Sequence, residues 1–157
     1  MSVNASAVMS NVVICTSPEA TLQEAVKILA EKNISGLPVV DENNKVVGII
    51  SEKDIVEYSS KLHAIPLIAF SSWVSPYTDV SSIASFKQGF ELLSSTRVKK
   101  IMSKRVITVN KDTPGNEIAK TMKKRNINRV PVVDENGELA GIITRTDLVN
   151  YLAGVGE

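Results

Sequence analysis

The sequence predicts a mixed α/β (α+β) fold built from two copies of one β-α-β-β-α repeat. The first observation is self-similarity, because the chain shifted by 93 residues matches itself without a gap, and 20 of the 51 positions from 8 to 58 are identical to their counterparts in 101–151. The second is that helix-like and strand-like apolar spacings follow each other in the same order in both copies. We expect repeat one over residues 1–60, a partly packed connector over 61–97 and repeat two over 98–157.

Each repeat is expected to open with a short β-branched strand, at 12–16 and 105–109, followed by a helix. In repeat one, Thr21 and Glu24 form a capping box. In repeat two, Thr113 supplies the cap and Pro114 takes the first helical position. The helices share an apolar face, which comprises Leu22, Ala25, Val26 and Leu29 in one copy and Ile118, Ala119 and Met122 in the other.

Two further strands joined by a polar turn, and then a second helix, complete each repeat. The strands are expected at 37–40 and 46–50 in repeat one, and Asn136-Gly137 in the turn of repeat two is a strong hairpin signal. The second helices begin at Ser51 and Thr144. One such unit is too small to be stable alone, so we expect the two copies to pack sheet to sheet around a pseudo-twofold axis.

The connector is rich in serine and contains most of the aromatic residues of the chain. A disordered linker would lack such residues, so we expect part of the connector to pack, with a helix over 83–93. It either caps one edge of the core, or covers a ligand cleft or forms an oligomer contact. The aromatic residues concerned are Phe70, Trp73, Tyr77, Phe86 and Phe90.

Composition excludes several classes of protein. No apolar run approaches the roughly 20 residues that a membrane helix needs, and Met1–Ser10 lacks the pattern of a signal peptide. With one cysteine, Cys15, and one histidine, His63, we expect neither a metal site nor a protease triad. The single cysteine favours a reducing compartment, which points to the cytoplasm.

The net charge of +1 conceals an asymmetry, because residues 1–78 carry −3 and residues 79–157 carry +4. A phosphate-bearing partner is therefore expected to bind to the second half of the chain. Its basic cluster at a helix end complements the helix dipole and lacks the interleaved aromatics of a nucleic-acid surface, so we do not expect nucleic-acid binding. The cluster comprises Lys120, Lys123, Lys124 and Arg125.

The most informative segment runs from Gly48 to Asp54 and recurs from Gly141 to Asp147. The hydroxyl of Ser51 or Thr144 and the carboxylate three residues later fit a capping box. They also fit a ribose site, because a carboxylate accepts hydrogen bonds from both ribose hydroxyls, and a nearby helix N-terminus favours phosphate.

Arg129 is the second candidate for a ligand contact. It is either a solvated arginine at a strand end or a phosphate clamp. Its counterpart in repeat one is Gly36, which carries no charge. The two sites are therefore expected to differ in phosphate affinity.

The repeated pattern Leu/Val-Pro-Val-Val-Asp followed by Gly-Ile-Ile-Ser/Thr-x-x-Asp resembles the cystathionine β-synthase (CBS) domain, and two in tandem resemble a CBS pair, or Bateman module. The resemblance covers residues 8–58 and 101–151. It implies a non-catalytic regulatory module that binds AMP, ADP, ATP or S-adenosylmethionine in clefts between the repeats and senses energy or metabolite state. It further implies no required cofactor, a homodimer and a regulated partner protein whose identity is unknown.

The resemblance also implies ligand contacts, with Asp54 and Asp147 holding ribose. Around the second cleft it places Thr144, Asp147, Arg129, Ile107, Ile127, Val130, Pro131, Arg105 and Thr146. Around the first it places Ser51, Asp54, Ile14, Ile34, Gly36, Leu37 and Lys53. Repeat one departs from the family at Cys15, where repeat two has Thr108, and has Gly36 where repeat two has Arg129, so the first cleft is expected to be either empty or suited to a ligand with less phosphate.

Two alternatives remain open. The chain would be a structural dimerisation module if its clefts were vestigial, although the presence of both ribose carboxylates argues against this. An enzyme acting on a nucleotide is disfavoured, because the sequence has no P-loop, no metal cluster and no acid–base pair beyond the ribose carboxylates.

Overall fold

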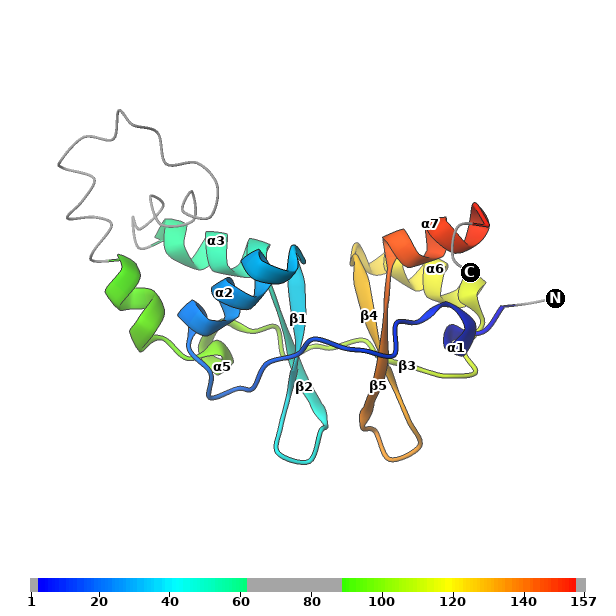
Figure 1. Cartoon of the computed structure of the whole chain (residues 1–157), viewed down its shortest axis with the longest axis horizontal. Coiled ribbons are helices and arrows are strands. Elements are labelled where there is room, and N and C mark those ends of the chain that lie inside the picture. Colours follow the sequence, from blue (N-terminus) through cyan, green and yellow to red (C-terminus); the bar gives the residue numbers. More distant parts are fainter. Residues whose placement is uncertain (1–2, 62–88, 155–157) are drawn as a thin grey trace. The chain divides into compact units, whose positions relative to one another are not determined.

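The computed structural model describes residues 3–61 and 89–154, and it confirms the mixed helix-and-strand class (Figure 1). The chain divides into two compact units. The first-repeat unit comprises residues 15–39 and 47–104, and the second-repeat unit comprises residues 1–14, 40–46 and 105–157, each in its described part.

The first-repeat unit consists of a two-stranded sheet and the helices around it. Its elements are α2 (Leu22–Lys32), β1 (Gly36–Val40), β2 (Val46–Ser51), α3 (Glu52–Lys61) and α5 (Val98–Ile101). Residues 89–95 are also helical. The core side chains come from every part of the unit and include Leu22, Leu29, Leu37, Ile50, Ile55 and Val98.

The helix α2 forms where the sequence predicts it. The Thr21 hydroxyl accepts from the Glu24 amide at 3.2 Å, and the Glu24 carboxylate accepts from the Thr21 amide at 2.8 Å. The helix ends at Asn33, which adopts the left-handed conformation with φ of 50°. The predicted apolar face is confirmed, since Leu22, Ala25 and Leu29 are buried.

The second-repeat unit contains a three-stranded sheet in the order β3-β4-β5, with β3 parallel and β5 antiparallel to β4. Its elements are α1 (Ala5–Val8), β3 (Val109–Asn110), α6 (Gly115–Arg125), β4 (Arg129–Val133), β5 (Leu139–Thr144) and α7 (Arg145–Leu152). One apolar cluster joins the sheet to the helices and comprises Ala5, Ile118, Met122, Val130, Val132 and Ile143.

Both hairpin turns follow the sequence prediction. Asp41 and Asp134 each accept two backbone hydrogen bonds of 2.9 Å from the turn that follows. Asn44 has a φ of 59° and its counterpart Gly137 has a φ of 76°, a left-handed region that asparagine and glycine tolerate best.

Each unit is completed by a segment that precedes the other repeat in the sequence. In the second-repeat unit, α1 lies beside α6 and α7, and Ser10 exchanges backbone hydrogen bonds of 2.9 and 3.1 Å with Ile142 (Figure 1). In the first-repeat unit, Ser103 exchanges bonds of 2.8 and 3.0 Å with Ile49. Sequence periodicity gives no sign of this exchange, because both segments are short.

Glycine makes this close approach feasible in both units. A Cβ atom at Gly141 would lie 2.5 Å from the Met9 sulfur and 3.1 Å from the Ser10 carbonyl oxygen. A Cβ atom at Gly48 would meet Met102 and Ser103 at the same distances. The glycines of the repeated motif therefore admit the exchanged segments.

The opening strands were predicted too long. Instead of a strand over 12–16, the structure has a single parallel bridge between Thr16 and Val39, and instead of 105–109 it has only Val109–Asn110. Val12 is 87% exposed, so the β-branched run has no neighbouring strand to pack against, and strand propensity without pairing is weak.

Two details of α6 were also predicted wrongly. Pro114 is the N-cap of α6 rather than its first helical residue, and the Thr113 hydroxyl accepts from the Asn110 amide at 3.1 Å instead of capping the helix. Ala119 is exposed, because the buried face passes through Ile118 and Met122, four residues apart.

The predicted connector helix over 83–93 falls only partly on described residues. Its described end is helical, and there Leu93 is buried while Phe90 is 48% exposed. His63, Phe70, Trp73, Tyr77 and Phe86 lie outside the described residues.

Candidate functional site

A hydroxyl and a carboxylate meet at the start of α7. The Thr144 backbone is extended, and its hydroxyl accepts from the Asp147 amide at 3.2 Å. In return, Oδ2 of Asp147 accepts from the Thr144 amide at 2.6 Å and from the Thr144 hydroxyl at 2.7 Å. The predicted capping box is therefore confirmed at this helix.

The same arrangement recurs at the start of α3. Oδ2 of Asp54 accepts from the Ser51 amide and from the Ser51 hydroxyl, both at 2.8 Å, and the Ser51 hydroxyl accepts from the Asp54 amide at 3.3 Å. Both carboxylates are half-buried. The duplicated sequence motif thus produces duplicated geometry.

This geometry leaves a chemical role open to each carboxylate. In the described part of the chain, the hydrogen bonds that Asp54 and Asp147 accept all go to Oδ2. Oδ1 retains its capacity to accept from a vicinal diol such as that of ribose. The cap holds each carboxylate in one orientation, so a ligand would meet a preorganised acceptor.

Backbone hydrogen bonds attach the start of each of these helices to the residue just before the first strand of the preceding hairpin. The Arg145 amide donates to the Asn128 carbonyl at 3.0 Å, and its Nε donates to the Ile127 carbonyl at 3.3 Å. At the equivalent place in repeat one, the Glu52 amide donates to the Ser35 carbonyl at 3.0 Å. Sequence reasoning missed Arg145, whose side chain lies on the backbone of a predicted ligand-contact residue.

Arg129 is placed next to the hydroxyl–carboxylate pair. It is the first residue of β4, is half-buried, and lies opposite Thr144 in the antiparallel register. Its counterpart Gly36 is the first residue of β1 and is buried. The charge difference seen in the sequence therefore falls at the same structural position in both repeats.

The predicted apolar contacts divide by burial. Val130 is completely buried in the core cluster and Pro131 is fully buried, so neither residue is exposed to a ligand in this structure. Ile127 and Ile107 are half-buried, and Ile127 packs against the core cluster. Arg105 is exposed in the segment before β3, and Thr146 is exposed in the first turn of α7.

The first site shows a similar division. Leu37 is completely buried, whereas Ile34 is half-buried and Lys53 is exposed. Ile14 is half-buried and belongs to the second-repeat unit. Cys15 is half-buried, and burial raises the pKa of its thiol, so the thiolate is disfavoured at neutral pH.

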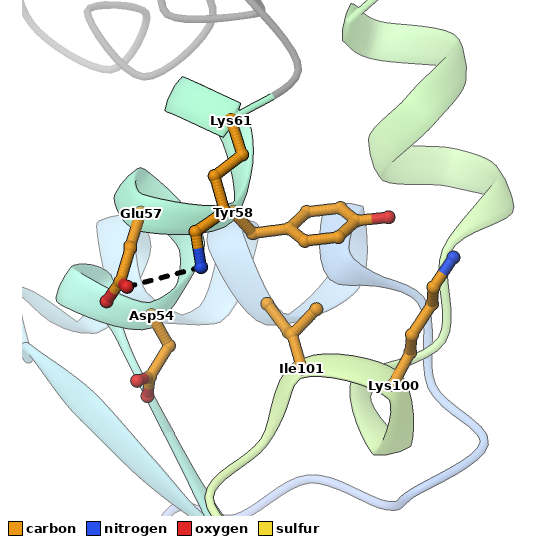
Figure 2. A pocket seen from close by; sticks show the side chains of 6 residues that line it. All are labelled: Asp54, Glu57, Tyr58, Lys61, Lys100 and Ile101. Carbon is orange, nitrogen blue, oxygen red and sulfur yellow. Dashed lines mark ion pairs between the residues drawn. The ribbon is translucent and has the colours of Figure 1, made fainter.

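A pocket of about 300 Å³ adjoins the first hydroxyl–carboxylate pair (Figure 2). It is lined by Asp54, Glu57, Tyr58, Lys61, Lys100 and Ile101. Sequence reasoning singled out only Asp54 among these residues. The other lining residues were missed because the pocket forms where α3 and α5, which are remote in sequence, pack side by side.

The described residues offer neither a metal-binding cluster nor a membrane-spanning helix. Within residues 3–61 and 89–154, no group of three or more histidine, cysteine or carboxylate side chains is arranged to hold a metal ion. In the same part of the chain, no helix is both long enough and apolar enough to cross a bilayer.

Comparison with known proteins places this geometry in a family. The model of the CBS domain matches residues 5–61 and 98–154. Protein MJ1426 of Methanocaldococcus jannaschii is 36% identical over 135 residues, which cover 83% of this chain and 80% of that protein.

Solved structures agree with the family match. One is the CBS domain pair of protein MJ0100 in complex with 5′-methylthioadenosine and S-adenosylmethionine, which is 28% identical to this chain. The match covers 96% of this chain and 99% of the MJ0100 chain, with a TM-score of 0.71. Another is protein MJ1225 of M. jannaschii, described as a putative archaeal homolog of g-AMPK, which is 26% identical with a TM-score of 0.76. That match covers 97% of this chain and 50% of the MJ1225 chain. Together, the duplicated motif, its duplicated geometry and these matches show that the chain belongs to the CBS domain family, as a tandem CBS pair.

Proposed function

We propose that the chain is a non-catalytic regulatory module that binds adenosyl ligands, namely AMP, ADP, ATP or S-adenosylmethionine, and so senses energy or metabolite state. One observation carries the proposal: the same hydroxyl–carboxylate pair stands at the start of α3 and of α7, with matching hydrogen bonds. The related CBS pair of MJ0100, crystallised with 5′-methylthioadenosine and S-adenosylmethionine, supports this class of ligand.

Each pair would hold a ligand through its ribose. Oδ1 of Asp54 or Asp147 would accept from the two ribose hydroxyls. At the second site Arg129, opposite Thr144, would bind phosphate with its planar fork, while Ile107 and Ile127 would contact the base. The first site has Gly36 in place of the arginine and would hold phosphate less well.

Regulation requires that the ligand bind two arrangements of the module with different affinity. A second, unidentified protein would respond to this change in arrangement. The likeness to MJ1225, described as a putative homolog of g-AMPK, supports a sensing role over a catalytic one.

A dimerisation module is the second candidate, and one observation favours it. The helix α7 contributes no buried residue and exposes Val149 at 62%, Tyr151 at 46% and Leu152 at 84%. Apolar side chains exposed together on one short helix are typical of an interaction surface.

Titration of the ¹⁵N-labelled protein with AMP and with S-adenosylmethionine tests the two candidates. Ligand binding predicts saturable shifts of the Ser51 or Thr144 amides, because each donates to a carboxylate that the ligand would contact. Unchanged spectra at millimolar ligand would contradict the proposal. Sedimentation of Leu152→Asp tests the alternative, which predicts that a dimer dissociates.

A further inference from the structure

The pocket beside Asp54 has a charge pattern that the second repeat does not share. On α3, Asp54, Glu57, Tyr58 and Lys61 are spaced at i, i+3, i+4 and i+7, so they lie on one face of the helix. Lys100 and Ile101 of α5 complete the lining. The pocket therefore holds two carboxylates, two ammonium groups and one aromatic ring.

One ion pair within the pocket is largely exposed. Figure 2 shows Lys61 folded back toward Glu57, with 3.3 Å between Nζ and Oε1. These two side chains are 70% and 59% exposed, and exposed ion pairs of this kind add little net stability. Both groups are consequently available to a ligand at small cost.

The ring of Tyr58 already attracts a cation. The Lys100 ammonium lies 5.8 Å from the ring centroid, within the range of a cation–π interaction. Figure 2 shows the ring reaching from α3 toward the side of Lys100. A sulfonium on a ligand would take the place of the Lys100 ammonium on this electron-rich face.

The second repeat lacks the charged groups of this pocket. At the shift of 93 residues, Asn150 replaces Glu57, Gly154 replaces Lys61 and Ala7 replaces Lys100, whereas Tyr151 matches Tyr58. The second repeat instead has Arg129 where the first has Gly36. The two repeats thus differ at both places where a ligand tail would extend from the ribose.

We propose that the pocket binds the zwitterionic amino-acid tail of an adenosyl ligand whose ribose is held by Asp54, so that the first site selects S-adenosylmethionine over AMP and ATP. This inference rests on the proposed function. Glu57 accepts from the ligand's ammonium, Lys61 and Lys100 donate to its carboxylate, and the Tyr58 ring faces its sulfonium.

The size and charge of the pocket favour a tail of this kind. A volume of about 300 Å³ is at the lower limit of small-molecule pockets and suits one part of a ligand rather than a whole nucleotide. A polyphosphate would satisfy both lysines but would place its negative charge beside Asp54 and Glu57. A zwitterion pairs with both kinds of charge.

Isothermal titration calorimetry on the Asp147→Ala variant of the whole 157-residue chain, which isolates the first site, tests the inference. Four probes differ only beyond the adenosine: S-adenosylmethionine, S-adenosylhomocysteine without the sulfonium charge, 5′-methylthioadenosine without the amino acid, and AMP. We expect S-adenosylmethionine to bind at least tenfold more tightly than 5′-methylthioadenosine or AMP. We expect Glu57→Gln to remove most of this preference and Tyr58→Leu to abolish the difference from S-adenosylhomocysteine.

The control variant is Lys99→Ala. Lys99 is the neighbour of Lys100 but does not line the pocket, so this variant should keep the preference for S-adenosylmethionine. Equal affinity for S-adenosylmethionine and 5′-methylthioadenosine, or tighter binding of AMP, would overturn the inference while leaving the proposed function intact. Absence of binding of all four probes to the wild-type chain would overturn the proposed function, and the inference with it.

Discussion

Arg129 lies directly opposite Thr144 across the antiparallel pair of β4 and β5. Thr144 in turn caps α7 and donates to Asp147. A cation, a hydroxyl and a carboxylate are thereby fixed at one end of the hairpin by strand register and helix capping. In the first repeat the hydroxyl and carboxylate recur, but glycine stands in place of the cation.

Replacing Arg129 by glycine, as in repeat one, should weaken the binding of phosphate-bearing ligands at the second site. A hydrogen bond to a charged group contributes about 1.5–3 kcal/mol, so the affinity for AMP should fall by roughly 10- to 100-fold. 5′-Methylthioadenosine, which has no phosphate, should bind unchanged. Calorimetry in an Asp54→Ala background measures both, with Arg125→Gln as a control at an exposed arginine of α6. An equal loss for both ligands would show that Arg129 does not act on phosphate.

Removing the cap hydroxyl with Thr144→Ala should destabilise the fold by about 1 kcal/mol, as expected for an N-cap residue. The reason is that the Asp147 amide loses the oxygen to which it donates. Urea denaturation measures the loss, and Thr144→Ser should restore most of it. A Thr144→Ala protein as stable as wild type would mean that the cap contributes nothing to stability.

Gly141→Ala should destabilise the second-repeat unit, because its Cβ would lie 2.5 Å from the Met9 sulfur and 3.1 Å from a backbone oxygen. Overpacking of this kind costs about 1–3 kcal/mol. Met9→Ala combined with Gly141→Ala should recover part of the loss, since the longer side chain no longer blocks the new methyl group. Chemical denaturation of the two single variants and the double variant gives the coupling energy, and strict additivity would contradict the close packing.

Glu19 should titrate below the usual range of a glutamate, because it accepts from Lys99 at 2.8 Å and lies near Arg97. A folded-state pKa below the unfolded one stabilises the protein above the unfolded pKa, and this contribution is lost as the pH falls through the folded pKa. Carboxyl NMR titration should show the lowered pKa, and Lys99→Ala should raise it. An unchanged pKa in Lys99→Ala would exclude the ion pair as the cause.

The repeat itself made most of the fold predictable. Similarity between the copies located the hairpins and the caps at Ser51 and Thr144, and helical spacing within each copy located the buried faces through Leu22 and Ile118, because each depends on local spacing and local hydrogen bonds. The opening strands failed because pairing, rather than β-branched composition, decides whether such a run becomes a strand.

The exchanged segments and the pocket at Lys100 were beyond sequence reasoning. Met9 and Met102 are identical at the repeat shift, yet nothing local indicates that each packs against a glycine in the unit of the other repeat. Lys100 meets Tyr58 only because α5 packs on α3, a contact between residues far apart in the chain. The ribose pairs were found because their hydroxyl and carboxylate are three residues apart.

The most direct test of the central claim is calorimetric titration of the wild-type chain with AMP, ATP and S-adenosylmethionine, beside Asp54→Ala, Asp147→Ala and the double variant. Thr21→Ala is the matched control, because it removes a helix cap outside both sites. We predict saturable binding of at least one of these ligands by wild type and by Thr21→Ala, the loss of one site in each single variant, and no binding by the double variant. Binding that survives in the folded double variant, or no binding by wild type at millimolar ligand, would contradict the account.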